Sequence, residues 1–163
     1  MRAELRPLVR VATALLGLAL VVACGDGTAG RRAEVAERGA KVMPFDLSAT
    51  THRFTKTSDG GVQTVTADDP ADNTQVRLIR QHLREERDNF AGGDYDDPAR
   101  IHGMNMPGVA QLRAGYERIS VSYSNVVSGA ELTYTTNDTD LVDAIHAWFD
   151  RQVMDHGAQG ETG

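Results

Sequence analysis

The chain has 163 residues, a formal net charge of −6 at pH 7 and a single cysteine. This length suits one small domain, and the acidic balance argues against nucleic acid or anionic headgroups as partners. A lone cysteine excludes an intrachain disulfide and any zinc site that needs several thiolates.

Residues 1–23 have the pattern of a secretory leader, in which arginines precede an apolar run too short to span a bilayer comfortably. Ala23 directly before Cys24, with the aliphatic Val21 two places before Ala23, resembles the lipobox of bacterial lipoproteins. The resemblance implies cleavage before Cys24 and its acylation, with palmitate among the chains. We therefore expect a protein anchored by lipid to the cell membrane, on the extracytoplasmic face. The alternative is an ordinary secretory signal peptide with an incidental cysteine.

Residues 24–42 predict a flexible tether that starts at the acylated Cys24. They carry charges and almost no large apolar side chain, so a short helix near residues 33–41 is not expected to pack. The segment Gly25-Asp26-Gly27-Thr28-Ala29-Gly30 fits a dinucleotide-binding motif. Because it follows a leader and not a strand of a sheet, we predict no nucleotide site there.

Residues 43–157 predict a single domain that opens with a β-hairpin. Threonine and valine favour strands over residues 52–57 and 62–66. The segment Asp59-Gly60-Gly61 between them favours a tight reversal.

Two amphipathic helices follow from the spacing of apolar residues. The first begins near residues 70–73 and ends at Gly92, and its buried face should hold Val76, Ile79, Leu83 and Phe90. The second follows the capping segment 137–140, and its buried stripe should hold Val142, Ile145, Phe149 and Val153, with Trp148 beside it.

The part between these helices contains an irregular segment over residues 94–107, a short helix over 109–116, and strands at 119–123 and 131–136. We therefore predict an α+β domain with an antiparallel sheet of about four strands. Two β-hairpins form this sheet, and each is followed by a helix packed on one face (ββα-α-ββα). Residues 158–163 predict a disordered tail.

Short motifs run through nearly the whole domain: Met43-Pro44-Phe45-Asp46-Leu47, Thr50-Thr51-His52, Asp59-Gly60-Gly61-Val62-Gln63-Thr64-Val65, Ile101-His102-Gly103, Met106-Pro107-Gly108, His146-Ala147-Trp148-Phe149-Asp150 and Asp155-His156-Gly157. This succession resembles a family of small exported bacterial domains of unestablished function. Members often carry the label aspartate carbamoyltransferase. We do not expect that activity here, because the chain is too short for that fold and lacks the Ser-Thr-Arg-Thr loop that binds carbamoyl phosphate.

The domain contains a set of candidate metal ligands: His52, His82, His102, His146, His156, Met104 and Met106. Strand alternation places His52 on the inward face with Phe54. His102 and the two methionines occupy every second position and would share one side of an extended segment. Imidazole with thioether suits copper, whereas imidazole with carboxylates such as Glu86 or Asp150 suits zinc. The sequence therefore predicts copper or zinc as the cofactor of a metal-binding lipoprotein.

Two other functions stay open. The histidines could be half-buried packing residues of an interaction lipoprotein, whose protein partner on the membrane surface is unknown. A small enzyme could instead use a neutral histidine with Asp46, Asp94, Asp96 or Asp97 as acid and base, although no nucleophile elbow or phosphate-binding loop is present.

Overall fold

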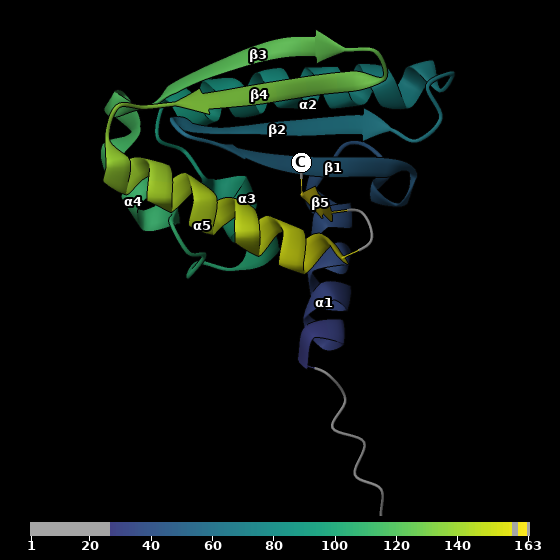
Figure 1. Ribbon diagram of the computed structural model, residues 1–163. Helices are drawn as coiled ribbons and strands as arrows, with labels where there is room; N and C mark the ends of the chain where they lie inside the picture. The colour runs from purple at the N-terminus through teal and green to yellow at the C-terminus, as the bar shows by residue number, and fades with distance from the viewer. Residues whose placement is uncertain (1–26, 158–159, 163) are drawn as a thin grey trace, which may run out of the picture.

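The computed structural model describes residues 27–157 and 160–162 (Figure 1). The predicted leader and Cys24 lie outside the described residues. Within the described part of the chain, no helix combines the length and the apolar character that crossing a membrane requires.

Two β-hairpins build one open sheet, which confirms the predicted α+β class. β1 (Thr50–Thr57) pairs antiparallel with β2 (Gly60–Ala67), and β3 (Ser120–Val126) pairs antiparallel with β4 (Gly129–Thr135). β2 and β4 are antiparallel neighbours, so these four strands lie in the order β3-β4-β2-β1.

A fifth strand lies at the edge of the sheet. β5 (Gly160–Thr162) pairs in parallel with β1, opposite residues 52–54. The predicted disorder of residues 158–163 is therefore wrong for these three residues, because their backbone groups extend the sheet.

The two faces of the sheet differ in polarity. Phe54, Val65, Leu132 and Tyr134 point to one face and are buried, whereas threonines dominate the other face. Successive side chains of a strand point to opposite faces, so this alternation lets one face pack and the other meet water. The predicted inward orientation of His52 is confirmed, since it is 5% exposed.

α2 (Asn73–Ala91) and α5 (Thr139–His156) cover the apolar face (Figure 1). Asp72 and Asp138 cap these helices by accepting hydrogen bonds from backbone N–H groups of the first turn. The four apolar residues predicted for the buried face of α2 are all buried.

Trp148 lies in the centre of the core. Its ring is fully buried and packs edge-on against Phe90 and Tyr134, with ring centroids 5.6 Å apart in both pairs. The predicted stripe placed Val142 and Val153 inside and Trp148 beside them, but both valines are only half-buried. Turning the large indole inward buries more apolar area than either valine would.

The connecting segments are more helical than predicted. Residues 94–107 were expected to be irregular, yet they contain α3 (Asp96–His102). Acidic residues in its first turn and basic residues in its last turn complement the helix dipole. α4 (Val109–Gly115) matches the predicted short helix, and the 3-10 turns η1 (Leu47–Ala49) and η2 (Tyr116–Arg118) complete the connections.

α1 (Gly27–Val42) packs against α3 and α5, so the prediction of a flexible tether over residues 24–42 is wrong for this helix. Val35 is its only large side chain that is buried. Arg31 holds the helix instead, through two bonds of 2.6 Å to the carboxylate of Asp155. Because α1 is held by arginines and has no apolar stripe, the hydrophobic pattern of the sequence could not predict that it packs.

Candidate functional site

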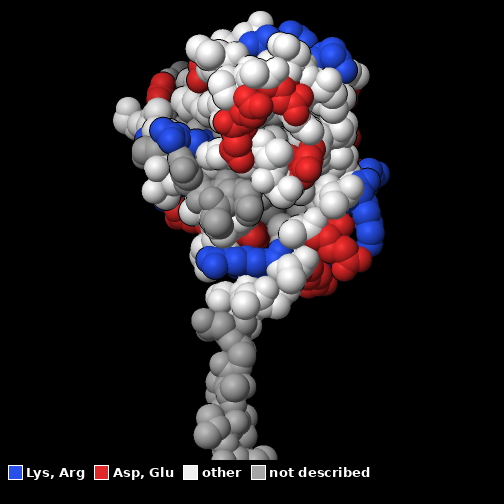
Figure 2. Space-filling view, turned by 90° about the vertical axis from the view of Figure 1, so that its right-hand side faces the viewer, with Lys and Arg blue, Asp and Glu red and all other residues white. Residues whose placement is uncertain are grey.

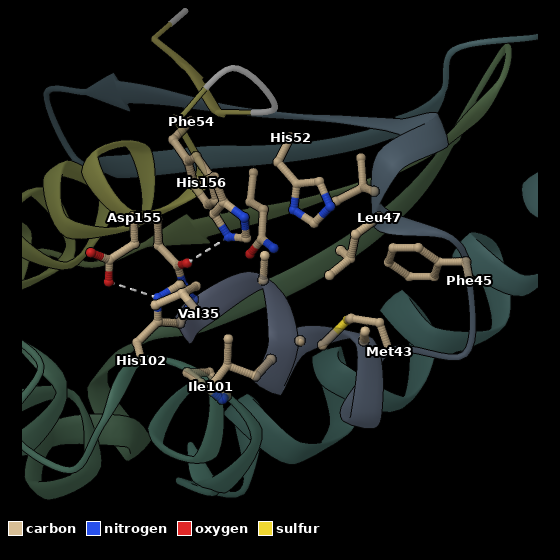
Figure 3. A pocket seen from close by; sticks show the side chains of 18 of the residues that line it. Val35, Met43, Phe45, Leu47, His52, Phe54, Ile101, His102, Asp155 and His156 are labelled. Carbon is tan, nitrogen blue, oxygen red and sulfur yellow. Dashed lines mark hydrogen bonds and ion pairs between the residues drawn. The ribbon is translucent and has the colours of Figure 1, made fainter. Parts of the chain in front are cut away.

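A cavity of about 640 Å³ lies between α1, β1, α3 and the C-terminal part of α5 (Figure 3). Met43, Phe45 and Leu47 lie toward one end, and His102 and His156 lie toward the other, with Val35 and Ile101 near His102. His52 lies between the two ends. A concave, mostly apolar space with a few convergent polar groups is typical of a small-molecule site.

Polar contacts hold the α1 wall of the cavity in place. Besides the Arg31 pair, Arg32 donates to the carbonyl of Met154 at 2.9 Å and Arg38 donates to the carbonyl of Ile101 at 3.2 Å. Figure 2 shows basic and acidic side chains next to one another where α1 meets the domain. This wall therefore depends on directional contacts more than on a packed apolar face.

Three histidines from three different elements meet in one cluster. The ring centroids of His52 on β1 and His156 at the end of α5 are 4.8 Å apart, and the two rings are stacked. The ring of His102, the last residue of α3, lies 5.2 Å from that of His156. We call these three residues the histidine cluster.

In two of these rings, hydrogen bonds determine which nitrogen carries the proton. Nδ1 of His102 lies 2.9 Å from Oδ2 of Asp155, and a carboxylate can only accept, so Nδ1 donates. Nε2 of His156 donates to Oε1 of Gln152 at 3.2 Å. A neutral imidazole has one N–H, so Nε2 of His102 and Nδ1 of His156 are acceptors.

Burial keeps the histidine cluster neutral near pH 7. Burial, together with smaller contributions from His82 and His102, lowers the pKa of His52 to about 4. Burial also lowers the pKa of His102, although the bond to Asp155 opposes this, and it lowers the pKa of His156 well below its usual range. Among the described residues, Nε2 of His52 has no hydrogen-bond partner.

Two more ionisable groups line the cavity from α2. His82 packs edge-on against Phe45 with ring centroids 5.7 Å apart, and burial lowers its pKa. Burial raises the pKa of Glu86 to about 7, against a hydrogen bond from Asn89 that lowers it. Near pH 7, His82 is therefore neutral, whereas Glu86 is about half ionised.

The remaining candidate metal ligands lie elsewhere. Nε2 of His146 donates to the carbonyls of Thr57 and Gly60, at 3.0 and 2.9 Å, and so braces the first hairpin turn. Met104 is 78% exposed, whereas Met106 is buried in the core. The predicted extended segment with His102 and both methionines on one side is wrong, because His102 ends a helix and glycine follows it.

The carboxylates considered for acid and base chemistry have structural contacts. Asp46 accepts from the backbone N–H of Ser48, and Asp94 accepts from the backbone N–H of Asp96. Asp96 and Asp97 form ion pairs with Arg113 and Arg100 on the surface. Asp150, considered as a zinc ligand, pairs with Lys56 at 2.5 Å.

Sequence reasoning missed Asp155, Gln152 and Arg31. The spacing of four between Gln152 and His156 places them on one helix face and could have suggested their contact. The contact between Arg31 and Asp155 joins residues 124 positions apart, and no local pattern indicates it.

Within the described residues, no group of three or more histidine, cysteine, aspartate or glutamate side chains is arranged as it stands to hold a metal ion. Comparison with known protein families, with curated proteins and with solved structures finds no match. The resemblance stated from the sequence therefore stays a prediction, and the site must be interpreted from its own geometry.

Glu86→Gln should stabilise the protein at pH 8 and have little effect at pH 4.5. The folded-state pKa of about 7 lies above the usual 4.5, so the stability linked to this proton is present below pH 4.5 and is lost as pH rises through 7. Glutamine keeps the acceptor for Asn89 without a charge, and the expected gain at pH 8 is about 2 to 3 kcal/mol. Urea unfolding at both pH values measures it.

Glu85→Gln is the matched control, since Glu85 is the exposed neighbour of Glu86. An equal change in the unfolding free energy of both variants at pH 8 would contradict a raised pKa of Glu86 in the folded protein.

Proposed function

We propose that this protein is a lipid-anchored extracytoplasmic binding protein whose cavity takes up a small, mostly apolar molecule. The observation that carries the proposal is the cavity itself. Its volume of about 640 Å³ lies within the range of roughly 300 to 1,000 Å³ that small-molecule sites occupy. Its two ends differ, with Met43, Phe45 and Leu47 at one and His102 and His156 at the other.

Two physical arguments support a bound molecule. Protein interiors are normally close-packed, and apolar walls without a packing partner lose dispersion contacts, so a space of this size lowers stability unless something fills it. A buried polar atom without a partner is also costly, and His52, which lines the cavity, carries such an atom in Nε2. A ligand with an apolar body and one polar group would offset both costs.

The membrane position rests on Cys24 and the residues before it. α1 begins three residues after Cys24 and forms one wall of the cavity. Acylation of Cys24 would therefore hold the cavity near the bilayer surface, which suits a ligand of low water solubility.

Cys24→Ser should release the protein from the membrane fraction. Its continued recovery there would contradict the anchor.

The uncharged fluorophore N-phenyl-1-naphthylamine should bind the wild-type protein at about one molecule per chain. Val35→Trp should weaken binding at least about tenfold, because Val35 is a buried cavity wall and indole would occupy the space. The fluorescence increase of the probe measures binding.

Val127→Trp serves as the control, because it introduces the same side chain at a site that is 91% exposed and outside the cavity. Equal probe binding by the two variants would show that the probe binds elsewhere.

A second candidate function is the binding of zinc or copper, and the histidine cluster favours it. Liganding histidines usually donate their second ring nitrogen to a carboxylate or carbonyl, as His102 and His156 do. Two imidazoles bound to one ion at about 2.0 Å have ring centroids about 5 Å apart, which is close to the separations here. The rings would have to reorient, and without a thioether the donor set suits Zn²⁺ or Cu²⁺ better than Cu⁺.

Titration with Zn²⁺ and with Cu²⁺ tests this candidate. Wild-type protein should bind one ion, and His102→Ala and His156→Ala should each weaken binding at least about tenfold. Met104→Ala is the matched control, since this side chain is exposed and outside the cluster. Unchanged affinity in both histidine variants would exclude the histidine cluster as the metal site.

A further inference from the structure

The polar end of the cavity offers hydrogen-bond acceptors. The proton of His102 is committed to Asp155 and that of His156 to Gln152. Each ring therefore keeps one nitrogen with a lone pair and no proton. Both residues line the cavity, so a molecule inside it meets these nitrogens at its histidine end (Figure 3).

The acceptor character of His102 is held by its surroundings. Asp155 is 3% exposed, and Arg31 fixes both of its oxygens at 2.6 Å, so the carboxylate cannot turn away from His102. Arg151 adds a further contact at 3.2 Å. Burial opposes protonation of the ring itself. The ring therefore presents the same unprotonated nitrogen to any ligand.

These features limit the chemistry of the ligand. At Nε2 of His102 or Nδ1 of His156, a carbonyl or ether oxygen would set one lone pair against another, and a carboxylate would do so while losing its hydration. An ammonium group at these nitrogens would also lose hydration, and the carboxylate beside His102, Asp155, is already paired with two arginines. A neutral group that donates a hydrogen bond avoids both costs.

We propose that the ligand is an uncharged alcohol or phenol. Its hydroxyl donates to Nε2 of His102 or Nδ1 of His156, and its apolar body lies among Val35, Phe45 and Leu47. This inference rests on the proposed binding function and adds the class of ligand to it.

A matched set of naphthalenes tests the inference on the purified full-length protein. 1-Naphthol and 1-methoxynaphthalene have nearly the same shape, but only the first donates a hydrogen bond. Isothermal titration should give naphthol an affinity about tenfold higher or more, because the ether leaves the acceptor nitrogen unpaired. The anion 1-naphthoate should bind more weakly than either.

Variants locate the contact. His102→Phe or His156→Phe should bring the ratio of the naphthol and methoxynaphthalene affinities close to one, while methoxynaphthalene still binds. His82→Phe is the matched control, since His82 lines the same cavity but packs against Phe45, and it should keep the wild-type ratio.

The outcomes separate this inference from the proposed function. Equal binding of the two neutral compounds to the wild-type protein overturns the hydroxyl inference and leaves small-molecule binding intact, as does tightest binding of 1-naphthoate. A ratio that changes only in His82→Phe overturns the assignment to His102 and His156. Failure of all three compounds to bind contradicts the proposed function as well. The wild-type comparison needs no variant to fold.

Discussion

One buried carboxylate holds the site together. Asp155 of α5 accepts from Arg31 of α1 at 2.6 Å through both oxygens and from Nδ1 of His102 at 2.9 Å, and it forms an ion pair with Arg151 at 3.2 Å. Taking a carboxylate out of water costs several kcal/mol, and charged partners with good geometry offset that cost. These partners come from α1, α3 and α5. Asp155 therefore holds these three helices, which surround the cavity, in fixed positions relative to one another.

This arrangement links the architecture to the chemistry of the cavity. The sheet and α2 supply a conventional apolar core around Trp148, which needs no ligand. The cavity lies beside that core, where α1 is held mainly by arginines and leaves space behind Val35. The carboxylate that fixes α1 also fixes the proton of His102. The same contact therefore shapes the cavity and sets what its polar end can recognise.

The sequence predicted the parts of the fold that depend on local pattern. Alternation and turn residues identified both hairpins, and the spacing from Val76 to Phe90 identified α2. The same reasoning failed for α1, because its packing depends on an ion pair between distant residues. All five histidines were equal candidates as ligands from the sequence, because pairing of the strands and docking of α3 and α5 decide which rings meet and leave His146 apart.

The most direct test of this account is the protonation state of the histidine cluster. Long-range ¹H–¹⁵N correlation spectra of the imidazoles at pH 7 distinguish the two neutral tautomers from the charged ring. We predict a neutral His102 protonated at Nδ1 and a neutral His156 protonated at Nε2. A charged ring at either position, or the opposite tautomer of His102, would contradict an acceptor-lined cavity held by Asp155.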